Sequence, residues 1–497
     1  MKRIQKIIYG KNHLKNAELL IQVGLIQDRL NNNEMALRCF AEALKMRRKL
    51  LDKNHHSVAE ALVHTGRMHH SNGDHFKSMG LFEEAIDIYR ESDGGTTSQE
   101  CAYALRLLGL SQSACGDKES ALSSFERCLN LSESTYGSES EQWAEVAYDL
   151  GIAKYEAGLY EDAVLLLDKF VLSQKSSRES GGGSESLSNA LFYLGKTYLR
   201  KQRSVDNAMV YFDEALAIRK QLSNNELGVS EVLFQIGGVR ESRKQYLESL
   251  VCYEESLKLR ISVSGEDEET ADIVSRIGEV RRIRGQYDLA LQNFTLALDM
   301  YKRTVGETHL SVANTYHSLG YVCDAKNDIQ KAMQNHKEGL SVRKLMLGRD
   351  HVKVASSLDD VAGMYQKQNE QAKALKCLKE ALRIRKLKLG NNDIEIGKTL
   401  FGMGIIFAAT NDNEKATECY NASLEISARD GSNPKLEAQT LHQIGCLHAA
   451  NCNYRDALQN WRTCLSKYRE SGLRDDHYMV ACTLGNIEMV ENILSTS

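Results

Sequence analysis

The chain has 497 residues, with 63 lysines and arginines against 67 aspartates and glutamates, so its formal net charge is −4. This balance excludes a polybasic nucleic-acid-binding protein and a strongly acidic tail protein. Average proline usage of ~5% predicts about 25 prolines, whereas Pro434 is the single one present. Because proline disrupts helix interiors, its near absence predicts helices that are joined by tight turns.

A pattern of three residues organises the predicted helices. A small residue recurs at spacings of 40 to 44 residues, as Gly24, Gly66, Gly109, Gly151, Gly195, Gly237, Gly278, Gly320, Ala362, Gly404, Gly445 and Gly485. A second small residue follows it, usually twelve positions later, for example Ala36, Ala332 and Ala416. A large side chain stands sixteen positions after the first, among them Phe40, Phe82, Phe125, Tyr253, Phe294, Tyr420 and Trp461.

Each period is predicted to be a pair of antiparallel helices. A turn signal separates the two small residues, such as SNGD at 71–74, ACGD at 114–117, KND at 326–328 and TND at 410–412, and apolar residues recur at three- and four-residue steps on both sides of it. The small residues let the two backbones approach, and the large side chain fills the space beside them. One pair cannot cover its own apolar face, so we expect the pairs to stack into a solenoid.

The elements follow in chain order. Residues 1–16 are expected to be the end of a preceding second helix and its turn, because Gly10 precedes Gly24 by the same fourteen residues that separate Gly306 from Gly320. A continuous solenoid is predicted over 17–497, in repeats at about 17–58, 59–100, 101–143, 144–187, 188–229, 230–270, 271–312, 313–354, 355–396, 397–437 and 438–476, with a capping helix at 477–497. The Ser- and Gly-rich stretch 173–188 is predicted to be a flexible loop within it.

These repeats resemble tetratricopeptide repeats, and two segments are similar to the 42-residue repeats of kinesin light chains: GLSVRKLMLGRDHVKVASSLDDVAGMY (339–365) and ALKCLKEALRIRKLKLGNND (374–393). The resemblance covers nearly the whole chain and implies an all-α, right-handed tetratricopeptide superhelix of about eleven repeats. It also implies protein partners; by resemblance alone these are a kinesin heavy chain or its cargo. The chain departs from the family where paired asparagines of the inner helices are replaced by His317–Ser318, Asp359–Asp360 and Phe401–Gly402.

The sequence shows no signature of catalysis. Gly-Lys-Thr occurs at 195–197 and 397–399, but the glycine that a phosphate loop needs five residues earlier is replaced by Ala190 and Asn392. His442 and Cys446 are four residues apart on a predicted helix, yet the tight cysteine pairs typical of zinc sites do not occur. We therefore expect no enzyme activity, no cofactor and no metal site.

Two sets of recurring residues receive a structural interpretation. His13, His56, His309 and His351 recur just before the first helix of a repeat, which indicates a role in the turn between repeats. Basic pairs recur at the ends of second helices, as Arg47–Arg48, Arg219–Lys220, Arg343–Lys344 and Arg385–Lys386. Cations at that end offset the negative pole of the helix dipole.

The candidate binding site is the inner groove, which the first helix of each pair lines in tetratricopeptide stacks. Helical geometry places the exposed inner positions three before, one after and four after the first small residue. The predicted peptide-binding residues are Tyr103, Arg106, Leu110, Tyr148, Ile152, Tyr155, Phe192, Lys196, Leu199, Arg200 and Phe234. An exposed aromatic stripe with a basic rim favours a peptide-binding groove. The alternative is that tight curvature or a shifted register buries these side chains between neighbouring inner helices.

The predicted function is a non-enzymatic scaffold or cargo adaptor that binds peptide segments of other proteins in this groove. The alternative is a regulatory or targeting module that is a fragment of a larger protein, enzymatic or not. No segment approaches the ~20 apolar residues of a membrane-spanning helix, and the twelve cysteines lack the spacing of a disulfide framework. We expect a cytoplasmic protein without membrane insertion or nucleic-acid binding.

Overall fold

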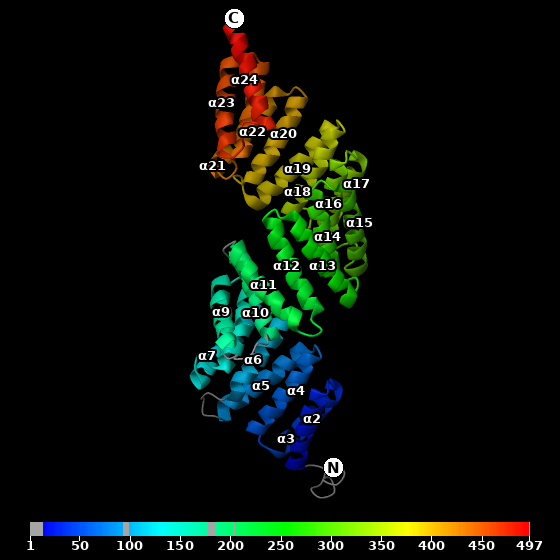
Figure 1. The fold of residues 1–497 in the computed structure, drawn as a ribbon, viewed down its shortest axis with the longest axis vertical. Coiled ribbons are helices and arrows are strands. Elements are labelled where there is room, and N and C mark those ends of the chain that lie inside the picture. Colours follow the sequence, from blue (N-terminus) through cyan, green and yellow to red (C-terminus); the bar gives the residue numbers. More distant parts are fainter. Residues whose placement is uncertain (1–12, 93–98, 177–183, 202–203, 497) are drawn as a thin grey trace. The chain divides into compact units, whose positions relative to one another are not determined.

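The computed structural model describes residues 13–92, 99–176, 184–201 and 204–496. Within these ranges the chain forms 23 α-helices and no strand (Figure 1). The helices are α2 (Leu14–Arg29), α3 (Asn33–Leu50), α4 (His56–Ser71), α5 (His75–Ser92), α6 (Gln99–Ala114), α7 (Lys118–Tyr136), α8 (Glu141–Glu156), α9 (Tyr160–Ser176), α10 (Glu185–Lys201), α11 (Val205–Gln221), α12 (Glu226–Ser242), α13 (Tyr246–Ser264), α14 (Glu268–Ile283), α15 (Tyr287–Thr304), α16 (Leu310–Ala325), α17 (Ile329–Leu347), α18 (Val352–Lys367), α19 (Gln371–Leu389), α20 (Ile394–Ala409), α21 (Asn413–Asp430), α22 (Pro434–Ala450), α23 (Tyr454–Glu470) and α24 (Tyr478–Thr496). The all-α prediction is confirmed.

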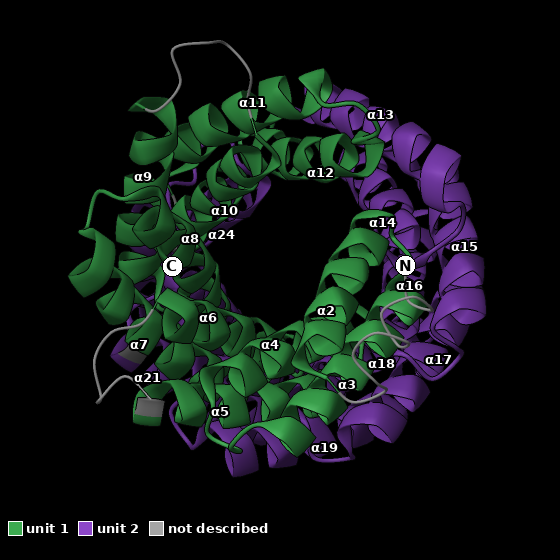
Figure 2. Ribbon diagram, turned by 90° about the horizontal axis from the view of Figure 1, so that it is seen from below, with its two compact units in different colours: residues 1–244 green, residues 245–497 purple. Residues whose placement is uncertain are grey.

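The helices pack in two compact units, residues 1–244 and 245–497, which Figure 2 colours separately. In the first unit, each even-numbered helix from α2 to α10 packs on the next odd-numbered one, and α12 packs on α11. In the second unit, α13 packs on α14, the pairs run from α14 with α15 to α22 with α23, and α24 packs on α23. Each unit is a helical solenoid, and the boundary between them falls inside the predicted repeat 230–270.

The helices of a pair approach closely where a glycine of the first faces a ring of the second. A Cβ added to Gly24 would lie 2.5 Å from Cε1 of Phe40, and one added to Gly404 would lie 2.4 Å from Cε1 of Tyr420. Both rings are fully buried, and so is the second small residue, as Ala36 shows. The predicted packing of two small residues around one large side chain is confirmed, because only a hydrogen fits under the ring.

In each pair whose turn lies within the described residues, one turn residue has a left-handed backbone. Gly73 and Gly116 have φ angles of 81° and 79°, and Asn327 and Asn411 take the same place at 62° and 59°. Glycine has no Cβ to clash in this conformation, and asparagine tolerates it better than most residues do. The turns predicted at SNGD, ACGD, KND and TND are confirmed.

Asn411 offers a test of this turn. We expect Asn411→Val to lower the free energy of unfolding by about 1–2 kcal/mol, because a β-branched side chain is strained at positive φ. Asn411→Gly should stay near the wild type, since glycine fills the same place in other repeats. Urea unfolding followed by circular dichroism measures both, and equal stability of the two variants would contradict the strain.

Histidines cap several first helices. Nδ1 of His13 accepts the amide N–H two residues later at 3.2 Å, and His309 and His351 do so at 3.3 and 3.1 Å. Their predicted role in the turn between repeats is confirmed. For α4 the prediction of His56 is wrong: the cap is His55, at 3.1 Å from the amide of the second residue after it, because the helix already begins at His56.

The predicted half-repeat, loop and capping helix are described by the structure to different extents. The predicted half-repeat lies largely outside the described residues, which begin at residue 13. α9 continues to Ser176 and α10 begins at Glu185, so both ends of the predicted loop 173–188 are helical, and 177–183 fall outside the described part. α24 contributes Val480, Ile487 and Val490 to the buried cluster of the last pair. No helix in the described ranges has the length and apolar character of a membrane span.

Candidate functional site

The predicted site residues lie on four helices of the first unit. Figure 2 shows its even-numbered helices on the inner side and its odd-numbered helices on the outer side. The inner helix α8 contacts both of its inner neighbours, α6 and α10. The residues are Tyr103, Arg106 and Leu110 on α6, Tyr148, Ile152 and Tyr155 on α8, Phe192, Lys196, Leu199 and Arg200 on α10, and Phe234 on α12. One row of inner helices therefore carries them all.

Their exposure is mixed. Tyr103 is 42% exposed, and Arg200 is also exposed. Eight others are half-buried: Arg106, Leu110, Tyr148, Ile152, Tyr155, Lys196, Leu199 and Phe234. Phe192 is only 8% exposed, so the burial that the sequence left as the alternative holds at this position.

Phe192 is buried because it packs on the outer helix of its own pair. Its ring centroid lies 5.9 Å from that of Phe212, and the guanidinium carbon of Arg219 lies 4.8 Å from its ring. Tyr148, which also stands three residues before a glycine, packs its ring 4.9 Å from Phe170 on α9. The position three before the glycine thus points toward the partner helix and only in part toward the inner surface.

The centre of the candidate site is an aromatic cluster around one ammonium group. Nζ of Lys196 lies 5.0 Å from the ring centroids of Tyr155 and Tyr193 and 5.2 Å from that of Phe192. The two tyrosine rings meet edge to face at 5.4 Å. Such cation–π contacts are favourable, and most so where water is partly excluded. The cluster joins α8 to α10 and leaves Tyr155, Tyr193 and Lys196 partly open to solvent.

Electrostatics at this cluster reflect its partial burial. Burial lowers the pKa of Lys196, and the nearby carboxylates of Glu231 and Glu156 oppose that effect. Burial likewise raises the pKa of Tyr193 to about 12, so its hydroxyl stays protonated and can donate a hydrogen bond. Tyr193 was not among the predicted residues, although it precedes the predicted Lys196 by three positions and so shares its helix face.

Arg106 is held by ion pairs with the next inner helix. Its Nε donates to Oδ2 of Asp149 at 2.5 Å, and its Nη1 pairs with Glu145. A small pocket of about 100 Å³ opens beside it, between Tyr103 and Tyr136. Arg106 therefore joins α6 to α8, and the exposed ring of Tyr103 forms one wall of a shallow recess.

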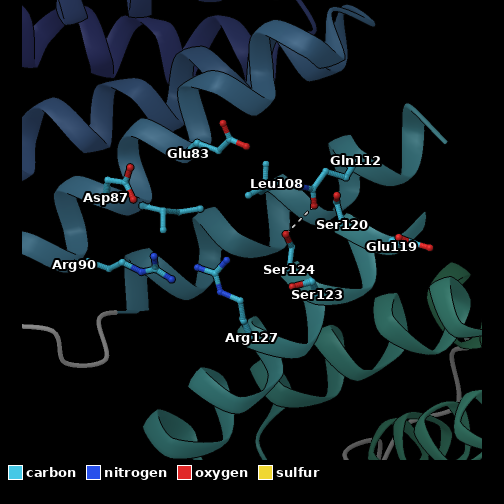
Figure 3. A pocket seen from close by; sticks show the side chains of 11 residues that line it. Glu83, Asp87, Arg90, Leu108, Gln112, Glu119, Ser120, Ser123, Ser124 and Arg127 are labelled. Carbon is cyan, nitrogen blue, oxygen red and sulfur yellow. Dashed lines mark hydrogen bonds between the residues drawn. The ribbon is translucent and has the colours of Figure 1, made fainter. Parts of the chain in front are cut away.

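A larger polar pocket was missed by the sequence analysis. It has a volume of about 590 Å³ and lies between α5 and α7, over α6. In Figure 3, Arg90 of α5 and Arg127 of α7 reach toward each other from opposite sides, and Ser124 donates a hydrogen bond to Gln112 at 2.7 Å. Its lining comes from second helices as well as a first one, whereas the predicted groove uses first helices alone.

Four arginines do more than offset the helix dipole, which was the only role that the sequence predicted for them. Arg47, Arg219, Arg343 and Arg385 are each no more than 7% exposed. Each reaches the first helix of the next repeat; Nη1 of Arg47, for example, donates to Ser57 O at 2.6 Å and Glu60 Oε2 at 2.8 Å. Their recurrence 23 or 24 residues after the first small residue of the repeat was the available signal. They are buried links between successive repeats.

Paired helices that stack with a glycine under a ring define this chain as an α-solenoid repeat protein. A family model for the tetratricopeptide repeat matches residues 29–91, 57–134, 269–345 and 353–429, which is more than half of the chain. The chain belongs to the tetratricopeptide repeat family.

Known proteins add detail to this assignment. A stretch of 199 residues, 40% of this chain and 32% of the relative, is 25% identical to Protein KINESIN LIGHT CHAIN-RELATED 1 of Arabidopsis thaliana. The chain thus spans about a third of that relative's length.

Solved structures show the same fold. The apo form of RapI matches with a TM-score of 0.56 and 15% identity over 75% of this chain and 98% of its own. A signal transduction ATPase with a tetratricopeptide repeat sensor from Pyrococcus horikoshii matches with a TM-score of 0.56 and 12% identity over 79% of this chain and 56% of its own. At these identities the likeness concerns the fold alone.

Proposed function

We propose that this chain is a non-enzymatic scaffold whose first unit binds a segment of a partner protein along the inner row of helices. The observation that carries the proposal is the cluster of Tyr155, Tyr193 and Lys196, which is only half-buried although it gathers two aromatic rings and a cation. Aromatic residues with a polar end are the anchors that protein interfaces use most. The family supports the class of function, since repeat solenoids present extended binding surfaces.

The chemistry of the cluster indicates what the partner segment offers. Tyr148 and Tyr155 give the proposed binding surface its apolar ring area. The cations of Lys196 and Arg200 lie on one helix, α10, four residues apart. A segment with apolar side chains and one or two carboxylates matches both features. By similarity to a kinesin light chain-related protein, we infer a cargo adaptor, with cargo or a motor subunit as the class of partner.

The test starts by identifying a partner through affinity capture and mass spectrometry, and then measures its affinity by calorimetry. We expect Tyr155→Ala with Lys196→Ala to weaken binding at least about 30-fold, the loss typical of a hot spot. The matched control is Leu165→Ala with Val210→Ala, which removes two side chains that are 60% and 64% exposed on α9 and α11. The control should bind as the wild type does. Unchanged affinity of the first variant, with unchanged helicity, would exclude this surface as the binding site.

A further inference from the structure

The second unit breaks the glycine-and-ring pattern at one place. Sixteen residues after Gly320, where other repeats have a ring such as Phe294, stands His336 on α17. Its imidazole takes the position of that ring: a Cβ on Gly320 would lie 2.5 Å from Cε1 and 2.6 Å from Nε2 of His336. A polar, metal-ligating side chain has thus replaced an apolar one in the core of a repeat.

The replacement leaves polar atoms without partners. His336 is 2% exposed, and in the described part of the chain neither Nδ1 nor Nε2 has a hydrogen-bond partner. An imidazole ring has a donor and an acceptor nitrogen when neutral, and burying both unpaired is unfavourable. Burial also lowers the pKa of His336, and the charge of Asp360 only partly opposes this.

Two further ligand groups converge on His336 from neighbouring helices. His317 lies on α16 and Asp360 on α18, and one ligand atom of each of the three residues lies within 4.8 Å of the others. Nδ1 of His317 is 3.0 Å from Oδ2 of Asp360. The His317 and His336 rings have centroids 5.7 Å apart at 73°. Three consecutive helices thus bring two imidazoles and one carboxylate to one point.

A neighbouring tyrosine fixes the orientation of the Asp360 carboxylate. The hydroxyl of Tyr321 donates to Oδ1 of Asp360 at 2.9 Å, which leaves Oδ2 facing His317. Partners of this kind fix metal ligands in many sites.

The other charged groups nearby are paired elsewhere. Arg343 donates to Oγ of Ser357 at 2.7 Å and to Oδ1 of Asn314 at 3.0 Å. Asp324 pairs with Lys367, and Arg282 pairs with Glu279 at 2.6 Å. Oδ2 of Asp360 is therefore left facing His317, with a ligand atom of His336 within 4.8 Å.

We propose that His317, His336 and Asp360 form a site for a divalent transition-metal ion of the zinc type. Two imidazoles and a carboxylate are a donor set that suits Zn²⁺, whereas Ca²⁺ and Mg²⁺ require many more oxygen ligands. Bonds of about 2.0–2.1 Å draw the three ligand atoms closer together. The His317 and Asp360 side chains are 27% and 13% exposed, so water can complete the coordination. The bound ion would pin α16, α17 and α18 together.

The test uses the full chain without an affinity tag, stripped with a chelator and titrated with Zn²⁺ in a calorimeter. We expect one ion per chain, and Co²⁺ in place of Zn²⁺ should give the visible absorption of a low-coordinate site. Loss of a supporting partner costs 10–100-fold in metal affinity, so loss of a ligand should cost at least about 100-fold. His336→Phe should show this loss and still fold, because it restores the ring of the other repeats. Asp360→Asn should show the same loss of Zn²⁺ affinity, and it leaves the buried His336 in place.

The control variant is His442→Gln, which removes a half-buried histidine whose Nδ1 already has a partner, Thr483 Oγ1 at 2.9 Å. It should bind Zn²⁺ as the wild type does. Absence of Zn²⁺ binding by the wild type, or wild-type affinity in both His336→Phe and Asp360→Asn, would overturn the proposal. In that case, the three residues would form only a close contact of His317 with Asp360 beside a buried imidazole.

Discussion

Replacing Arg385 by alanine is expected to lower the free energy of unfolding by about 2–4 kcal/mol, somewhat less than the loss seen for fully buried ion pairs, because its carboxylate partners are partly exposed. Arg385 is 2% exposed. It pairs with Asp359 Oδ2 at 2.5 Å on α18, bonds to the hydroxyl of Thr399 on α20, and lies 3.6 Å from Glu395. Without the arginine, the carboxylate of Asp359, whose side chain is 32% exposed, would lose the cation that balances it.

The pH dependence separates this cause from simple loss of packing. Burial raises the pKa of Asp359 to about 6 even though Arg385 opposes it, and removing the arginine would raise it further. A carboxyl whose pKa is higher in the folded state than in the unfolded chain contributes stability at low pH that is lost as the pH rises. The Arg385→Ala variant should therefore lose less stability at pH 5 than at pH 7.

A control lies two residues away on the same helix. Arg383 is 50% exposed and pairs with Asp350 and Glu380 at the surface. Exposed pairs contribute little to stability, so Arg383→Ala should unfold near the wild-type urea concentration. Urea unfolding at the two pH values, followed by circular dichroism, measures all of these effects. Similar small losses in both variants would show that Arg385 acts only on the helix dipole.

The fold could be predicted because its main constraint is local and periodic. Gly404 and Tyr420 are sixteen residues apart on adjacent helices. The same contact between a small residue and a large side chain recurs at this spacing in other repeats. The turn residue Asn411 is likewise fixed by its neighbours in sequence. Such features recur, and recurrence can be read from one chain without coordinates.

The candidate site could be predicted only in part, since exposure depends on side chains from other helices. Tyr148 and Phe192 occupy the same repeat position, yet Phe192 is buried because Phe212 and Arg219 cover it. The cluster around Lys196 draws on α8 and α10, so its members are not periodic along one helix. Helix geometry placed the residues on the inner row of helices but could not predict how exposed each of them is.

The proposed histidine–aspartate site was also missed because its residues come from different helices. A search for ligands along single helices considered His442 and Cys446, whereas His317, His336 and Asp360 come from three helices. The available signal was His336 itself, a histidine at a position that holds a large apolar side chain in the other repeats. A break in a periodic core position is therefore as informative as the period.

The aromatic column itself is expected to carry much of the stability of each pair, and Trp461 tests this best. It is 1% exposed, and its Nε1 donates to His442 O at 3.1 Å. We expect Trp461→Ala to cost about 3–5 kcal/mol, because it leaves a large cavity in the cluster that also holds α24. Urea unfolding followed by circular dichroism measures the loss.

The glycine under the ring should be coupled to it. A Cβ on Gly445 would lie 2.4 Å from Nε1 of Trp461, so we expect Gly445→Ala to cost about 1–3 kcal/mol through overpacking. In a Trp461→Leu background that cost should vanish, because the chain already pairs an alanine with a leucine at Ala362 and Leu378. A double-mutant cycle isolates the coupling.

A second glycine provides the matched control for this cycle. Gly485 lies on α24 with no atom within 4 Å of the place of its Cβ. Alanine is a better helix former than glycine by ~1 kcal/mol, so Gly485→Ala should stabilise the chain by up to about that amount. If Gly445→Ala were equally stabilising, or if its cost persisted beside Trp461→Leu, the ring could not be the reason for the glycine. The repeated glycine would then need another cause, such as the approach of the two helix backbones themselves.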